Sequence, residues 1–191
     1  MGKARIYSRG VESIWRPARR VARHAIPERY AVWLFTEESL TDRVVAACGS
    51  RFKIRVVSQI WGRPARSEAQ ALAEDPQRYA WIRQVCLMCG DTPWIYARSV
   101  VPRRTLSGRT RRLRYLRTRS LGSVLFSDPS MRRSEFEIAS LNPGDPLHTA
   151  AAQSLAARPA PIWARRAVYQ LAGKPLLVTE VFLPGIGSCP P

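Results

Sequence analysis

The sequence predicts an α+β fold built on one antiparallel sheet. Two pairs of β-prone runs flank the turn sequences Gly90-Asp91-Thr92-Pro93 and Ala172-Gly173-Lys174-Pro175, which is the pattern of β-hairpins. Helical patterns are few and short. Hairpins pair neighbouring strands antiparallel, so these observations favour an antiparallel sheet with a few helices. The length of 191 residues suits a single domain with a sizeable core, with or without an added arm.

The first elements predicted along the chain are two helices and a strand. Residues Glu28–Phe35 read as a short helix, and Ser39 is a suitable N-cap for a second helix that ends at Gly49. The segment Phe52–Trp61 alternates in part between apolar and polar residues, which predicts a strand. Glycine and proline residues across 62–77 predict a loop with a helical turn.

The clearest hairpin joins Tyr79–Cys89 to Trp94–Val101. If four residues make the turn, the alternation of side chains places Arg83 and Arg98 diagonally on one face of the sheet. A turn of different length would change this parity. Two cations so close favour an anionic ligand or a carboxylate such as Glu180. The alternative is a solvated basic face.

The remaining patterns complete the sheet. They are an Arg-rich segment at 103–120 with Leu113 and Leu116 on its apolar side, a short apolar element at 121–126, a strand at 134–139, a Pro/Ala-rich loop or insertion at 140–161, and a closing hairpin of strands 162–171 and 176–184.

The charge is strongly basic, with 31 Lys+Arg against 14 Asp+Glu and a net charge of +17. Such a charge attracts anions of every class, including nucleic acid, acidic membranes and carboxylate substrates. The eight arginines of 103–120 form a nucleic-acid patch or a solvated helix face, and we favour the solvated face because no recognised nucleic-acid module accompanies them. For residues 1–23 we expect a disordered basic arm rather than a membrane-surface helix.

Cysteine usage and hydropathy indicate a reducing compartment. Neither a signal peptide nor an apolar run of the ~18 residues needed for a membrane span is visible. We therefore expect a cytoplasmic protein with free thiols at Cys48, Cys86, Cys89 and Cys189. Cys86-Leu87-Met88-Cys89 has the spacing of a metal motif, but residues three apart on a strand point to opposite faces. His24 and His148 are isolated, so we expect no metal.

Glu180 is the single charged residue of the apolar run Leu176–Pro184. An ionised carboxylate in such a strand points into a core or a cavity, where it is costly unless it is paired or hydrogen-bonded. Facing arginines, it suggests a pocket for a small polar substrate. A structural ion pair is the alternative.

Several stretches resemble the chorismate lyase family: Tyr79–Arg83, Pro93-Trp94, Ala97–Pro102, Thr105–Gly108, Leu121-Gly122, Leu125-Phe126 and Leu171–Pro184. The resemblance implies a lyase that converts chorismate to 4-hydroxybenzoate and pyruvate for ubiquinone biosynthesis, without metal or cofactor. It also implies a sheet of about six strands with helices packed on one face, and helical flaps over an internal ligand cavity. The lyase-like domain would span 24–186, with the insertion at 140–161, in a monomer.

The resemblance assigns roles to five residues. Arg83 would grip the ring carboxylate, Arg98 would hold the other carboxylate and polarise the enolpyruvyl group, and Glu180 would meet the 4-hydroxyl as a base or as a positioning group. Leu121 would help to enclose the ring. Leu40 would lie on a flap, where the best-known relatives carry a methionine.

Two other functions compete with the lyase. One is a non-catalytic small-carboxylate sensor on the same fold, since related folds serve as effector-binding domains of bacterial transcription regulators. The other is a basic nucleic-acid-binding protein, whose binding would weaken steeply with salt. Neither explains a buried carboxylate opposite paired arginines as well. A transient contact with a membrane surface is compatible with the charge.

Overall fold

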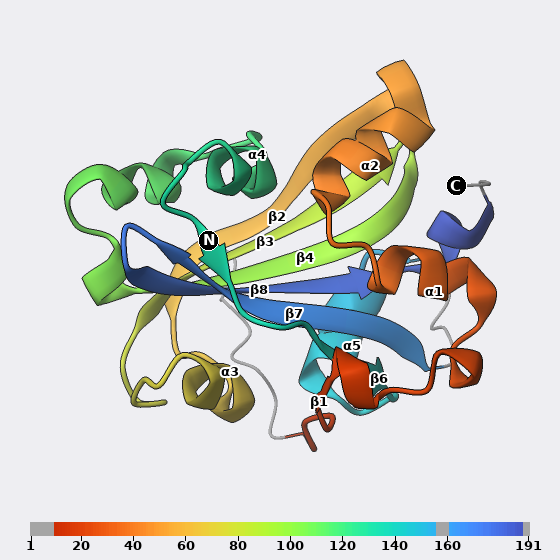
Figure 1. The fold of residues 1–191 in the computed structure, drawn as a ribbon, viewed down its shortest axis with the longest axis horizontal. Coiled ribbons are helices and arrows are strands. Elements are labelled where there is room, and N and C mark those ends of the chain that lie inside the picture. Colours follow the sequence, from red (N-terminus) through yellow and green to blue (C-terminus); the bar gives the residue numbers. More distant parts are fainter. Residues whose placement is uncertain (1–9, 156–160, 189–191) are drawn as a thin grey trace.

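One antiparallel sheet runs through the computed structural model, which describes residues 10–155 and 161–188 (Figure 1). Within those ranges the sheet has eight strands in the order β1-β6-β7-β8-β4-β3-β2, and β5 also pairs with β7. In chain order the strands are Arg16–Pro17 (β1), Phe52–Gly62 (β2), Ala80–Cys89 (β3), Thr92–Pro102 (β4), Arg132–Arg133 (β5), Glu137–Leu141 (β6), Ile162–Leu171 (β7) and Lys174–Phe182 (β8).

Helices cover both faces of this sheet, with α1, α2 and α4 on one side and α3 and α5 on the other (Figure 1). The α-helices are Glu28–Leu34 (α1), Leu40–Cys48 (α2), Arg66–Ala71 (α3), Leu121–Phe126 (α4) and Pro146–Ala152 (α5). Short 3₁₀ helices lie at Ala18–Arg20, Arg23–Ala25, Gly49–Arg51, Arg103–Thr105, Gly108–Tyr115 and Pro184–Ser188.

The predicted α+β class and antiparallel sheet are confirmed, but two details of the prediction are wrong. The described sheet has more than about six strands because β1 and β5, of two residues each, pair at its margin. Helices lie on both faces of the sheet because β3 carries apolar side chains on both of its faces, and each face needs a covering layer. Val85 and Leu87 pack with α1 and α2, whereas Cys86 and Met88 pack with α5.

Two predicted loops or arms contain regular structure. Within the expected basic arm at 1–23, Arg16–Pro17 pair with β6, while residues 1–9 lie outside the described residues. The expected loop or insertion at 140–161 contains α5, and its residues 156–160 lie outside the described residues. The carboxylate of Asp145 caps this helix by accepting bonds from the amides of Leu147 and His148. An Asp N-cap followed by Pro at the first helical position is a known helix start, so the sequence did contain this signal.

The Arg-rich segment matches the expectation of a solvated face. Leu113 and Leu116 are buried, whereas Arg109, Arg111 and Arg112 are exposed. The segment adopts 3₁₀ geometry over Gly108–Tyr115 rather than a regular α-helix.

The central hairpin is tighter and less regular than predicted. The turn between β3 and β4 has only two residues, Gly90 and Asp91, and Gly90 has a φ of 59° that glycine tolerates. Leu87 pairs with Ile95 whereas Met88 pairs with Pro93, so Trp94 is an extra residue in β4. This β-bulge shifts the pairing of the whole strand by one residue, which exchanges its two faces.

Cys48, the last residue of α2, forms a disulfide with Cys89, the last residue of β3, with 5.6 Å between their Cα atoms. The prediction of free thiols is therefore wrong for this pair. Cys86 is a buried free thiol on the opposite side of β3, and Cys189 lies outside the described residues. The bond ties the end of α2 to the sheet.

Replacing Cys48 by serine is expected to lower the free energy of unfolding by about 4 kcal/mol. The disulfide closes a loop between cysteines 41 residues apart, which restricts the unfolded chain. Urea unfolding of the oxidised wild type and of Cys48→Ser measures the loss. A thiol reductant should destabilise the wild type equally and the variant no further; a wild type indifferent to reductant would contradict the expectation.

No helix in the described ranges is both long enough and apolar enough to cross a bilayer.

Candidate active site

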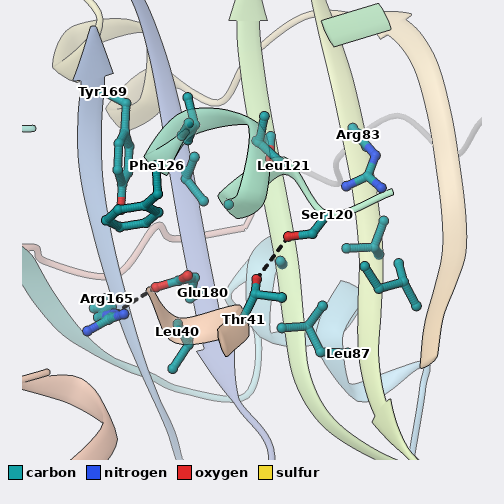
Figure 2. A pocket seen from close by; sticks show the side chains of 17 residues that line it. Leu40, Thr41, Arg83, Leu87, Ser120, Leu121, Phe126, Arg165, Tyr169 and Glu180 are labelled. Carbon is teal, nitrogen blue, oxygen red and sulfur yellow. Dashed lines mark hydrogen bonds and ion pairs between the residues drawn. The ribbon is translucent and has the colours of Figure 1, made fainter. Parts of the chain in front are cut away.

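A pocket lies on the α2–α4 side of the sheet (Figure 2). Strands β2, β3, β4, β7 and β8 form its floor, and α2 and α4, whose first turns we call the lid, line its other side. Most of its lining is apolar, and its charged groups are Arg83 on β3 and the Arg165–Glu180 pair on β7 and β8. The floor contributes Ile54, Arg83, Val85, Leu87, Ala97, Ser99, Arg165, Tyr169, Val178 and Glu180, and the lid side contributes Leu40, Thr41, Ser120, Leu121, Gly122, Leu125 and Phe126.

Arg83 lies at one side of the pocket, on β3, and is 3% exposed. One terminal nitrogen donates to the carbonyls of Arg117 and Arg119, both at 2.9 Å, which fixes the guanidinium against the loop before α4. Among the described residues its buried Nε–H has no hydrogen-bond partner. Burial lowers the pKa of Arg83 to about 10, so the side chain is a cation at neutral pH. A buried cation with an unused donor suits an anionic ligand.

Glu180 lies on β8, and its Oε2 accepts a bond of 2.6 Å from Nε of Arg165 on β7. The Arg165 side chain is 1% exposed and that of Glu180 is 15% exposed. Arg165 is not among the site residues predicted from the sequence. The two-residue turn Ala172-Gly173 makes Arg165 the direct cross-strand partner of Glu180. A tight turn at this glycine was the signal that could have identified Arg165.

Arg83 and Glu180 face the same pocket from separate strands (Figure 2). Strand β4 lies between β3 and β8, and Arg83 is level with Val178, two residues from Glu180. Strand spacing and rise per residue place the two Cα atoms roughly 12 Å apart. The pocket thus presents a cation and a carboxylate separated by an apolar surface.

The lid is held together by polar contacts at its two helix starts. Ser39 caps α2 by accepting from the amide of Asp42, as predicted. Ser120 caps α4 and donates to the hydroxyl of Thr41 at 3.1 Å, which joins the two helices (Figure 2). A Cβ on Gly122 would lie 3.0 Å from that hydroxyl oxygen, so the close approach depends on glycine. Leu40 and Leu121, one from each helix, both line the pocket.

Tyr169 of β7 also lines the pocket. Burial, reinforced by the negative charge of Glu180, raises the pKa of its phenol. The hydroxyl therefore stays protonated and remains available as a hydrogen-bond donor.

The sequence of this chain is similar to those of known proteins. The sequence model of the chorismate lyase family matches residues 11–188. The chain belongs to the chorismate lyase family. A probable chorismate pyruvate-lyase of Methylococcus capsulatus is 40% identical over 83% of this chain and 96% of its own length. A second, from Nitrosospira multiformis, is 37% identical over 91% of this chain and 94% of the relative. A third, from Cupriavidus pinatubonensis, is 41% identical over 86% of each chain.

Solved structures share the fold of this chorismate lyase family member at low sequence identity. A GntR-family transcriptional regulator of Bacillus cereus superposes with a TM-score of 0.52 at 11% identity, covering 71% of this chain and 94% of the regulator. This likeness shows the fold alone.

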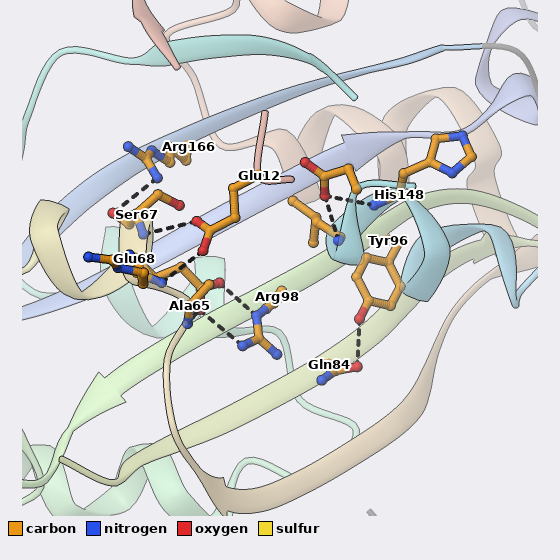
Figure 3. A network of polar contacts seen from close by, with 12 residues as sticks. Glu12, Ala65, Ser67, Glu68, Gln84, Tyr96, Arg98, His148 and Arg166 are labelled. Carbon is orange, nitrogen blue, oxygen red and sulfur yellow. Dashed lines mark hydrogen bonds and ion pairs between the residues drawn. The ribbon is translucent and has the colours of Figure 1, made fainter. Parts of the chain in front are cut away.

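Arg98 is not in the pocket of this chorismate lyase family member, which corrects the sequence-based placement. Because of the bulge at Trp94, Arg83 pairs with Ser99 while Arg98 pairs with Gln84 on the opposite face. There Nε and a terminal nitrogen of Arg98 donate to the carboxylate of Glu68 of α3, at 2.7 and 3.0 Å (Figure 3). Both residues are buried, so the pair holds α3 to the sheet.

Replacing Glu68 by glutamine is expected to lower the free energy of unfolding by about 3 kcal/mol at neutral pH, because the Arg98 guanidinium loses its buried carboxylate. Burial raises the pKa of Glu68, but the charge and hydrogen bonds of Arg98 outweigh it and hold that pKa below its ordinary 4.5. A depressed native pKa gives stability that is complete above the unfolded value and lost as pH falls through the native value. Urea unfolding across acid pH should show the variant's deficit narrowing below 4.5.

Glu137→Gln supplies the matched control for Glu68, because Glu137 also pairs with a buried arginine, Arg166, but is 35% exposed. Its loss should be about 1 kcal/mol or less. Equal losses in the two variants would show that burial of the Glu68 pair adds nothing.

No three His, Cys, Asp or Glu side chains gather as metal ligands would in the part of the chain that the structure describes.

Proposed function

We propose that this protein is a chorismate pyruvate-lyase, which converts chorismate to 4-hydroxybenzoate and pyruvate and so supplies ubiquinone biosynthesis. The observation that carries the proposal is the pocket with the buried cation of Arg83 at one side, the Arg165–Glu180 pair at the other and an apolar surface between them. The family and its curated relatives, which bear the name of this activity, support it.

In the proposed complex the two polar ends of 4-hydroxybenzoate meet the two charged sides of the pocket. In the proposal the ring carboxylate accepts from Arg83, whose buried Nε–H has no partner among the described residues. The ring lies over Val85 and Ala97 of the floor and under Leu121 and Leu40 of the lid, which enclose the internal cavity with the ligand bound. The hydroxyl at the opposite ring position then meets Glu180.

The reaction needs little from the protein beyond position and charge. The C3–O bond of chorismate breaks, the C4 hydrogen leaves as a proton, and the methylene of the departing enolpyruvyl group gains a proton to become the methyl of pyruvate. Aromatisation of the ring supplies the driving force. Held between Arg83 and Glu180, chorismate is fixed in a reactive conformer, and the charged groups stabilise charge that develops during bond cleavage.

The two cations that line the proposed site are Arg83 and Arg165, not Arg83 and Arg98. Because chorismate is a dianion, this positive pocket in a chain of net charge +17 favours its capture. Arg98 acts in the proposal only as the structural partner of Glu68. We further propose a cytoplasmic monomer with its lyase domain at 24–186, whose basic surface touches membranes at most transiently.

An assay of both products tests the function. Purified protein is incubated with chorismate and a chelator, and 4-hydroxybenzoate and pyruvate are followed together. Equal formation of both, lost in Arg83→Ala and kept in Arg55→Ala, is expected, because Arg55 is exposed on β2 outside the pocket. Saturable binding of 4-hydroxybenzoate without turnover would instead indicate a sensor. If the protein shows neither turnover nor binding, the proposal is overturned, and a nucleic-acid-binding function becomes the next one to test.

A further inference from the structure

The guanidinium of Arg165 bonds both to Glu180 on the floor of the pocket and to the main chain that leads into α2 of the lid. Its Nε holds Glu180, and one terminal nitrogen donates to three main-chain carbonyls, those of Trp33, Leu34 and Thr36, at 3.1, 3.2 and 2.7 Å. The first two close α1 and the third lies in the linker 35–39, which leads into α2. Leu40, the first residue of α2, lines the pocket.

These carbonyls are the groups that a helix end leaves unsatisfied. The last turn of a helix has carbonyls without intrahelical donors, and a cation there is favourable. A strand residue distant in sequence supplies that donor here. The rings of Phe136 and Phe182 flank the guanidinium, with their centroids 4.2 and 5.8 Å from Cζ, and keep it away from water. The hydrogen bonds of Arg165 are therefore made in a dry environment, where each is costly to lose.

We propose that Arg165 is a positioning residue that couples the lid to Glu180. It fixes Oε2 of Glu180, which leaves Oε1 for the ligand hydroxyl, and the same planar group anchors the linker on which α2 opens and closes. This inference rests on the proposed function for the identity of the ligand. A ligand that engages Glu180 then stabilises the closed lid, and lid opening weakens the hold on Glu180, because coupling between two sites is reciprocal.

The chemistry of arginine makes the proposal specific. A lysine would keep the positive charge but could not hold the carboxylate and three carbonyls in one plane. A glutamine would remove the charge as well, so the carboxylate of Glu180 would lose the opposite charge beside it. Arg165→Lys therefore tests the anchoring of the lid with the charge opposite Glu180 kept, whereas Arg165→Gln removes both the anchor and that charge.

The test uses Arg165→Lys, Arg165→Gln and the neighbouring Arg166→Lys as the matched control. Arg166 is also buried on β7 but faces the other side and pairs with Glu137. Release of 4-hydroxybenzoate, followed by stopped flow, should be at least tenfold faster in both Arg165 variants and unchanged in the control. The single-turnover rate should fall further in Arg165→Gln, which has lost the charge opposite Glu180, than in Arg165→Lys, which keeps it. Unchanged release and equal single-turnover rates in folded Arg165 variants would overturn the proposal.

A second measurement keeps the proposal testable if the Arg165 variants fail to fold. Hydrogen exchange of the amides in 35–42 is compared between the ligand-free wild type and Glu180→Gln. Exchange should be several-fold faster in the variant, because Arg165 loses its charged partner and holds the linker less firmly. Identical exchange would overturn the coupling. This arm needs no turnover, so its failure is distinct from a failure of the proposed lyase activity.

Discussion

Arg83→Ala is expected to lower kcat/KM for chorismate by about 10²–10³-fold, which is the cost of removing a buried, hydrogen-bonded cation from the anion it binds. Two losses combine in this variant. The ligand carboxylate loses the donor at Nε, and the carbonyls of Arg117 and Arg119 lose the group that fixes the loop before Leu121. Steady-state kinetics with both products monitored measures the change.

Arg83→Lys separates the two roles of Arg83. A lysine retains the charge, but its compact ammonium cannot serve two carbonyls and a carboxylate in one plane, so we expect partial activity. The surface variant Arg55→Ala should match the wild type. Full activity in Arg83→Ala would show that the ring carboxylate does not bind at Arg83, and it would contradict the proposed orientation of the substrate.

Glu180→Gln is expected to lower kcat by about 10²-fold or more, within the range that a positioned proton acceptor contributes. The amide fills the same volume but can neither accept the C4 proton nor carry charge opposite Arg165. Single-turnover kinetics, which exclude product release, give the cleanest value. Dissociation constants for 4-hydroxybenzoate measured alongside show whether the loss lies in binding or in chemistry.

Glu180→Asp is the companion variant for this position. It keeps the carboxylate but withdraws it by one methylene, so its turnover should lie between those of the wild type and Glu180→Gln. Unchanged turnover in Glu180→Gln would remove Glu180 from any essential proton transfer. The reaction would then proceed by direct transfer of the C4 hydrogen to the enolpyruvyl methylene, with Glu180 only holding the ring.

The sequence was sufficient for the parts of the site that depend on local pattern. The continuous apolar run of the final strand and the single carboxylate within it located Glu180, and the resemblance located Arg83, Leu40 and Leu121. The structure brings all four to one pocket. The cap of α2 at Ser39 was predictable because a hydroxyl at a helix start has a local partner.

The errors came from features that depend on distant packing. Nothing local marks Trp94 as an inserted residue, since its place in the bulge is set by burial against Trp33 of α1, and that one residue moved Arg98 to the other face. The disulfide joins a helix end to a strand end that the sequence could not bring together. Arg165 and the helix start at Asp145 were within reach of known turn and cap rules.

The connectivity of the sheet has a consequence for the order in which this chain folds. Strands β3–β4 and β7–β8 close as local hairpins, and the pairing of β4 with β8 joins them into one sheet. The bond from Arg165 to the carbonyl of Trp33 spans 132 residues. Contacts of such sequence separation form slowly because their loops must close first. We therefore expect the hairpins to protect their amides from exchange early in refolding, and the ligand-binding pocket to be the last region to form. Pulse-labelled hydrogen exchange that found the Arg165 anchor protected before either hairpin would reverse this order.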